Sequence, residues 1–306
     1  MIIKGFLLMC VSALDTAMMS TARKRYDRHC GNSMSAAMGL PFFCFSLVVL
    51  FLLIWQGGFP KFDAVAFLLA GIYGVLSLLN TVLAIGATHY GNISMIGVFC
   101  SLGALCLSPL YGFIFNPQDN GINVPMILGY ALSLTVLGLN FKTDVGSQNR
   151  TKQQKRRFNL CCLGLFVATG ICAVLFYVKK DYAPTFPNND FILLYMLVST
   201  VVAGLWLLWL FLKPNTRTVT KQSVFQSFRP CVVWIFPVYA LLIGLGEWTA
   251  LAATSFLPIV IKAPLSFSLP VVFTATMDFA FYRSKPSRRQ WLQIGLAVLA
   301  SLCFVL

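Results

Sequence analysis

Four charged side chains, Asp15, Glu247, Lys262 and Asp278, interrupt long apolar stretches of the sequence. A charge at the centre of a membrane-spanning helix costs roughly 2.5–3.5 kcal/mol on insertion scales, so such residues usually bind an ion or a substrate, or pair with one another. Asp15 could hold a cation or exchange a proton; the alternative is that neighbouring hydroxyl groups satisfy it. We expect Asp278 to pair with loop cations such as Arg283 at the edge of the membrane.

Glu247 and Lys262 are a candidate buried pair. They lie in consecutive apolar stretches that must run antiparallel, and at about 1.5 Å of rise per residue their depths differ by only about 6 Å. The pair could belong to a binding site, or it could be a structural salt bridge with no other role. The sequence leaves both possibilities open.

Aromatic side chains in the same stretches could complete such a site. Tyr73, Tyr239 and Trp248, together with Trp234 and Tyr195, could stack on a planar or cationic ligand. The alternative is that they anchor helix ends at the membrane–water interface, where Trp and Tyr are enriched.

The apolar stretches around these residues are the elements that must position them. Of the 306 residues, 58% are hydrophobic and 10% are charged, and the mean hydropathy is +0.80, whereas a soluble domain carries about 25% charged residues. A spanning helix needs about 20 predominantly apolar residues. The stretches that qualify are 5–22, 33–55, 64–88, 91–115, 122–141, 158–178, 189–212, 231–254, 256–281 and 287–306. We therefore predict an all-α membrane protein with ten transmembrane helices, with nine or eleven as the alternatives.

Basic residues predict the orientation of these helices. Most of the 23 Lys and Arg residues fall in alternate loops, around 23–28, 142–157, 213–229 and 283–289. Short basic loops remain in the cytoplasm. Both termini should therefore be extracytoplasmic, and we expect an integral protein of a bacterial inner (plasma) membrane. This placement of the charges also argues against nucleic acid as a partner, despite a net charge of +14.

The two halves of the chain resemble each other. When Tyr239 is aligned with Tyr73, further identities follow without a gap, and Asn80-Thr81 falls on Gly246-Glu247. Asn80 and Thr81 therefore become candidate site residues at the depth of Glu247. Because each half holds an odd number of helices, the copies must insert with opposite orientations, the plan of many transporters with a site near the midplane. We predict two inverted five-helix repeats, 1–141 and 158–306, joined by a cytoplasmic polybasic linker, 142–157.

These repeats resemble the paired EamA-type repeats of the drug/metabolite transporter superfamily. The resemblance rests on residues 79–88, on 248–254 with the prolines that follow, and on 290–295 at the start of the last helix. The run Ala13-Leu14-Asp15 resembles the first helix of the small multidrug resistance family, a relative in which a mid-helix carboxylate exchanges protons against cationic drugs. The resemblance implies a transport function and a proton or cation site at Asp15.

The function expected from the sequence is a secondary active transporter of small metabolites or drugs. It would act as an exporter, importer or exchanger by alternating access around a central cavity, with proton coupling left open. The alternatives are a channel, a facilitator or a membrane scaffold that does not transport. The expected partners are a small-molecule substrate and membrane lipids, and a homodimer is left open.

An enzyme is not expected. The chain has two His residues, His29 and His89, far apart in sequence, and it has none of the H-E-x-x-H, G-x-S-x-G or P-loop motifs. No metal site and no cofactor are expected either.

Overall fold

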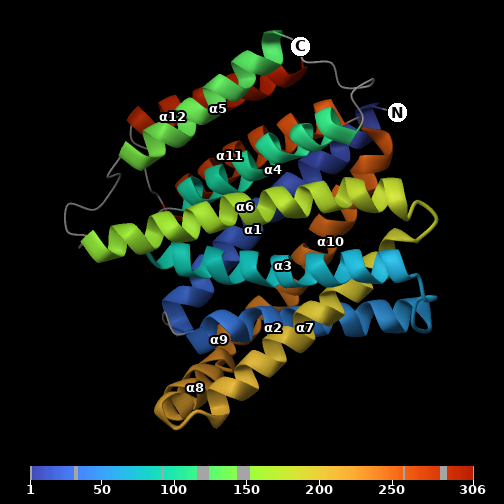
Figure 1. The fold of residues 1–306 in the computed structure, drawn as a ribbon. Coiled ribbons are helices and arrows are strands. Elements are labelled where there is room, and N and C mark those ends of the chain that lie inside the picture. The colour runs from blue at the N-terminus through green and yellow to red at the C-terminus, as the bar shows by residue number, and fades with distance from the viewer. Residues whose placement is uncertain are drawn as a thin grey trace.

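A computed structural model describes residues 2–30, 34–90, 93–115, 124–142, 152–257, 259–282 and 288–305. The described residues form α-helices and the connections between them (Figure 1). The helices are α1 (Ile2–Cys30), α2 (Met34–Gln56), α3 (Ala64–Tyr90), α4 (Ile93–Phe115), α5 (Val124–Lys142), α6 (Lys152–Tyr182), α7 (Asn188–Leu212), α8 (Pro214–Ser227), α9 (Pro230–Val233), α10 (Ile235–Phe256), α11 (Ile259–Tyr282) and α12 (Arg288–Val305).

Helix length and composition make the chain a multi-span membrane protein. Within the described residues, six helical segments are long and apolar enough to cross a membrane, and they lie in α1, α2, α3, α6, α7 and α10. Shorter apolar helical segments lie at Leu102–Gly112, Ile127–Val136 and Val272–Phe281, in α4, α5 and α11. Each stretch predicted as a span overlaps one helix of at least 18 residues. The all-α membrane class is thus confirmed.

Two predicted ends differ from the structure because the helices continue through basic segments. The first predicted span stops at residue 22, whereas α1 continues through Arg23 to Cys30. The last six residues of the predicted linker, from Lys152, belong to the start of α6. Lys, Arg and Gln are good helix formers, so a helix can extend past its apolar part into water. Residues 143–151 lie outside the described part of the chain.

Helix α8 occupies a segment expected to be a loop, whereas α9 lies at the start of the predicted span 231–254. Pro214 begins α8 at a position where its missing N–H costs nothing. The Thr216 hydroxyl donates a hydrogen bond to the Leu210 carbonyl (2.8 Å), which fixes the bend after α7. The segment is polar, so a search for apolar spans does not detect it. The short α9 ends at Val233, and α10 begins only at Ile235.

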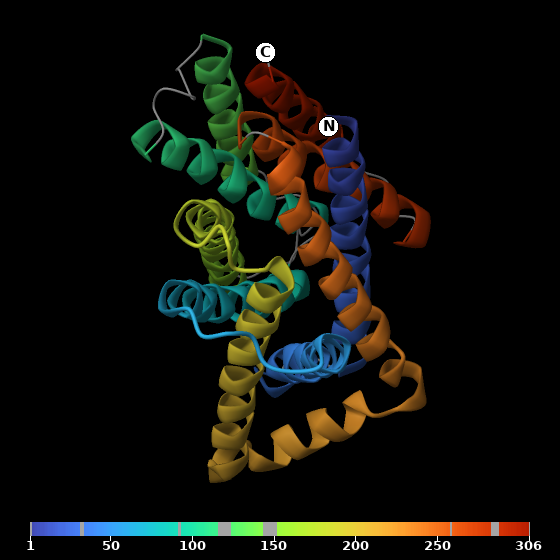
Figure 2. The ribbon, with the colours of Figure 1, turned by 90° about the vertical axis from the view of Figure 1, so that its right-hand side faces the viewer.

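The long helices pack in a repeating pattern. Helix α1 packs against α10 and α11, and α6 packs against α3 and α4. Helix α2 packs against α7, α4 against α11, and α5 against α12. In Figure 1 the α5–α12 pair lies at the top of the bundle and the α2–α7 pair near the bottom. The second view shows α6, α3 and α4 on one side of the centre and α1, α10 and α11 on the other (Figure 2).

Small residues let several of these helices approach closely. A Cβ placed at Gly103 of α4 would lie 2.0 Å from the Phe166 carbonyl oxygen of α6. A Cβ at Gly74 of α3 would lie 2.6 Å from the Tyr195 carbonyl oxygen of α7. Ser199 of α7 donates a hydrogen bond to the Gly74 carbonyl (2.7 Å) across the same contact. Close backbone approach through small residues is how helices associate in lipid, where burial of apolar surface provides little force.

Candidate functional site

A cavity of about 240 Å³ lies among α1, α3, α4, α6, α10 and α11. Its lining residues come from both groups of helices that Figure 2 shows, so the cavity is central to the bundle. Two side chains of opposite charge line it, Glu247 and Lys262. The other polar residues of the lining are Ser12, Thr16, Tyr73, Asn80, Ser108, Thr169, Tyr177 and Ser266. The remaining wall is largely apolar, which suits a site for a small organic molecule.

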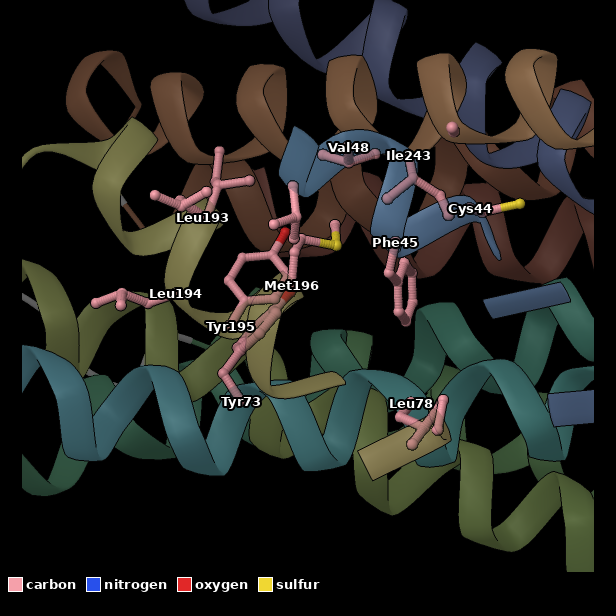
Figure 3. Close-up of a cluster of buried hydrophobic side chains, with 14 of the residues drawn as sticks. Cys44, Phe45, Val48, Tyr73, Leu78, Leu193, Leu194, Tyr195, Met196 and Ile243 are labelled. Atoms are coloured by element: carbon pink, nitrogen blue, oxygen red, sulfur yellow. The ribbon is translucent and has the colours of Figure 1, made fainter. Parts of the chain in front are cut away.

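Glu247 is the only glutamate in the chain, and α10 points it into this cavity. The Tyr73 hydroxyl of α3 donates a hydrogen bond to Glu247 Oε2 (3.0 Å). Tyr195 of α7 interacts electrostatically with the same carboxylate, and its ring lies 4.5 Å from that of Tyr73 (Figure 3). The Tyr73 ring also stacks on Phe176 of α6 at 4.8 Å. Aromatic side chains from α3, α6 and α7 therefore form the cluster against which the Glu247 carboxylate lies.

Lys262 is 5% exposed on α11. Its ammonium nitrogen lies 5.5 Å from the ring centroids of Phe176 and Tyr177. Rings at this distance attract a cation through their negative faces. Within the described residues, the Lys262 ammonium donates no hydrogen bond.

The structure brings Glu247 and Lys262 to one cavity, as their matching depths predict. They influence each other electrostatically. In the described part of the chain, however, no direct salt bridge joins them. The carboxylate contacts Tyr73 and the ammonium contacts two aromatic rings instead.

Asp15 lies beside this cavity, in the interface between α1 and α10. It is 5% exposed, and a Cβ placed at Gly246 would lie 3.4 Å from the Asp15 Cβ and 3.8 Å from its Oδ2. Asp15 Oδ2 is buried and has no hydrogen-bond partner. The neighbouring hydroxyls bond backbone carbonyls: Ser12 donates to Gly246 (3.4 Å) and Thr16 to Ser12 (2.9 Å). The structure therefore does not use these two hydroxyls to satisfy the carboxylate.

The remaining sequence candidates divide into one on the cavity and three away from it. Asn80 lines the cavity, and its Oδ1 is buried without a hydrogen-bond partner. Thr81 donates to the Ser77 carbonyl of its own helix (3.1 Å). Tyr239 is fully buried and accepts a hydrogen bond from Arg23 Nε. Trp248 is 47% exposed and faces outward from α10. The pairing expected between Asp278 and Arg283 stays a prediction, because residues 283–287 lie outside the described chain.

Sequence reasoning missed the contribution of α6. Phe176 and Tyr177 line the cavity and contact Lys262, and Thr169 and Cys172 line it one to two turns earlier. Phe176 and Tyr177 stand directly before a basic, polar helix end, a pattern typical of interfacial anchors. No sequence signal separates that role from a cavity wall.

Comparisons with known proteins add information on the fold. No protein-family model matches the chain, and no curated protein sequence does. A crystal structure described only as that of a protein is similar, with a TM-score of 0.57 and 13% identity, over 98% of this chain and 96% of the other. A structure of the H+/Ca2+ exchanger CAX aligns over 98% and 87% of the two chains at 12% identity, but its TM-score of 0.21 is too low to support a shared fold. The first likeness shows that this helical arrangement occurs in another protein of similar size.

Proposed function

We propose that the chain is a secondary active transporter of small metabolites that works by alternating access around the central cavity. The observation that carries the proposal is a cavity of about 240 Å³ lined by one carboxylate and one ammonium, in a multi-span membrane protein. Ionisable side chains inside a membrane are costly and mark substrate or ion pathways. A scaffold without transport has no use for a polar cavity at this place.

The proposal includes ten spans arranged as two inverted repeats, 1–141 and 158–306. Helix packing supports it, because the contacts keep their pattern when the halves are exchanged. Helices α1, α2, α3, α4 and α5 then correspond to α6, α7, α10, α11 and α12. The α1–α10 and α1–α11 contacts become α6–α3 and α6–α4, whereas α2–α7, α4–α11 and α5–α12 map onto themselves.

The directions of the first helices support inversion. In Figure 1 α1 starts at the right, beside the N-terminus, and runs toward the left, whereas α6 starts at the left and ends at the right. Two equivalent helices that run in opposite directions are what inverted copies require. Membership of the drug/metabolite transporter superfamily, as an EamA-type protein, is part of the same proposal and rests on the repeat and the residues that resemble it. A location in the inner membrane of a bacterium, with both termini extracytoplasmic, is also part of the proposal.

Transport can be tested with the purified full-length protein in liposomes. Liposomes loaded with a mixture of unlabelled metabolites should take up labelled members of that mixture by exchange. Glu247→Gln should reduce uptake at least about tenfold, the effect of losing one charged hydrogen bond. Leu241→Ala, on the outer face of the same helix with Leu241 61% exposed, should transport normally. Equal uptake by protein-free liposomes would contradict the proposal.

A further inference from the structure

The chain buries two lysines to the same extent and treats them differently. Lys179 and Lys262 are each 5% exposed. The Lys179 ammonium donates to the Phe186 carbonyl (2.6 Å) and to Asn188 Oδ1 (2.7 Å), so it is a structural cation that ties α6 to α7. Lys262 has two aromatic faces at 5.5 Å and an electrostatic interaction with Glu247, but among the described residues its ammonium donates no hydrogen bond. Its hydrogen-bonding capacity is unused and is directed at the cavity.

A second part of the cavity wall has unused acceptors. Glu247 accepts a hydrogen bond from Tyr73 (3.0 Å) and interacts with the Tyr195 hydroxyl, and a carboxylate has further acceptor positions. Asn80 Oδ1 is buried on the wall of the same cavity and has no hydrogen-bond partner among the described residues. Buried polar atoms without a partner are costly. The cavity thus has an acceptor wall, formed by Glu247 and Asn80, and a donor wall, formed by Lys262, and each has hydrogen-bonding capacity to spare.

Charge balance determines which class of solute can bind to both walls of the cavity. An anion alone would meet Lys262 but leave Glu247 facing it, and a cation alone would do the reverse. In a low-dielectric site an uncompensated buried charge is strongly unfavourable. A solute that carries both charges satisfies both walls and brings no net charge into the membrane.

We infer that the cavity binds a small zwitterion, a solute with one ammonium group and one carboxylate, with the ammonium at Glu247 and Asn80 and the carboxylate at Lys262. Phe176 and Tyr73 provide aromatic surface between the two ends. The volume of about 240 Å³ is below the roughly 300–1,000 Å³ of sites for drug-sized ligands, which limits the solute to a small molecule. This inference rests on the proposed function, because it names the substrate class of the same cavity.

Matched sets of probes test the inference by thermal unfolding of the purified full-length protein. Each set has a zwitterion, its carboxylate-only analogue and its amine-only analogue. The sets are L-alanine with propionate and ethylamine, L-leucine with 4-methylvalerate and isoamylamine, and L-phenylalanine with 3-phenylpropionate and phenethylamine. At least one zwitterion should raise Tm, and its two analogues at equal concentration should not. A result in which no zwitterion raises Tm, or in which an analogue raises it as much, overturns the inference.

Charge-changing variants sharpen the test. Glu247→Gln leaves Lys262 as the only charge and should exchange zwitterion binding for binding of the carboxylate analogue, with zwitterion affinity about ten- to hundredfold weaker. Lys262→Met should shift the preference to the amine. Glu247→Asp and Lys262→Arg keep the charges and should keep the zwitterion preference. Leu241→Ala and Val272→Ala, on the exposed faces of the same two helices, are matched controls. An unchanged preference in both charge-removing variants overturns the assignment of the two walls.

The two proposals fail in different ways. If a zwitterion binds as described but does not cross the membrane of reconstituted liposomes, the transport function is wrong and the assignment of the cavity stands. If the liposomes transport a neutral or singly charged solute and no zwitterion binds, the transport function stands and the assignment is wrong.

Discussion

Asp15 is a residue at which a substitution can distinguish the proposed proton coupling from solute binding. Its carboxylate lies against Gly246 at the edge of the cavity, and Asp15 Oδ2 has no hydrogen-bond partner. A carboxyl group there can exchange a proton while a solute occupies the adjacent cavity. Its contact with α10 would pass the effect of that exchange to the helix that carries Glu247.

Asp15→Asn keeps the shape of the side chain and removes the proton exchange. We expect this variant to insert and fold normally, to exchange solute across liposomes without a pH gradient, and to lose uptake driven by a pH gradient. Proton movement can be followed with a pH-sensitive dye trapped inside the liposomes. Normal gradient-driven uptake by Asp15→Asn would make Asp15 a structural residue.

Tyr73 and Tyr195 allow a matched comparison of two hydroxyl groups beside one carboxylate. Tyr73→Phe removes the donor to Glu247 Oε2, and a hydrogen bond to a charged group contributes about 1.5–3 kcal/mol. The buried Tyr195 hydroxyl interacts electrostatically with the same carboxylate but forms no geometrically good hydrogen bond among the described residues, so Tyr195→Phe should cost less. Thermal unfolding of the two purified variants should show a clear loss of Tm for Tyr73→Phe and little for Tyr195→Phe. Equal losses would mean that the Tyr73–Glu247 hydrogen bond is not what positions Glu247.

At the scale of helices, packing depends on positions that carry no side chain. Gly103→Ala would place a Cβ 2.0 Å from the Phe166 carbonyl oxygen, so α4 and α6 would have to separate, at a cost of about 1–3 kcal/mol. A Cβ at Gly71 of α3 meets nothing within 4 Å, and Ala favours a helix over Gly by up to about 1 kcal/mol. Thermal unfolding should therefore show a lower Tm for Gly103→Ala and an unchanged or higher Tm for Gly71→Ala. The reverse order would refute the close α4–α6 contact.

The helices themselves could largely be predicted from the sequence, and their faces could not. The predicted span 64–88 agrees with α3 (Ala64–Tyr90) because an apolar run of that length has one stable arrangement in lipid. Trp248 shows the limit: it follows Glu247 directly, yet it is exposed while Glu247 lines the cavity. Lipid and protein interior are both apolar, so hydropathy does not tell which face of such a helix turns inward. A search for apolar spans does not predict α8, because its sequence is polar.

The candidate site could also be predicted only in part: the sequence identifies its charged residues but not their contacts. Charge inside apolar runs identifies Glu247 and Lys262, and depth along the helices places them together. Whether they touch depends on the rotation of α10 and α11 and on the rings of α6, which the sequence does not specify. Asn80 was found through the repeat, whereas its neighbour Thr81 bonds its own helix instead.

At the scale of the whole molecule, orientation in the membrane can be tested at two equally exposed positions. Phe62, between α2 and α3, and Phe225, on α8, are each 80% exposed and lie at opposite ends of the bundle (Figure 1). Each is changed to Cys in a background from which all ten native cysteines are removed. In bacterial spheroplasts, a membrane-impermeant thiol reagent should label Phe62→Cys at once and Phe225→Cys only after permeabilisation, because the basic loops should be cytoplasmic. Immediate labelling of Phe225→Cys would reverse the orientation.

The helix contacts that are kept when the two halves are exchanged have a further consequence for the proposed transport. In the proposed inverted repeat the backbone frame occurs twice, but the cavity charges do not: Glu247 and Lys262 both belong to the second half, and Asn80-Thr81 aligns with Gly246-Glu247 in the first. When the halves exchange conformations, the solute meets an equivalent frame with its charged groups in non-equivalent places. The half-saturation concentration for entry from one side should therefore differ from that for entry from the other. The direction of net flux is still set by the gradients across the membrane, since no asymmetry of a binding site can drive transport by itself.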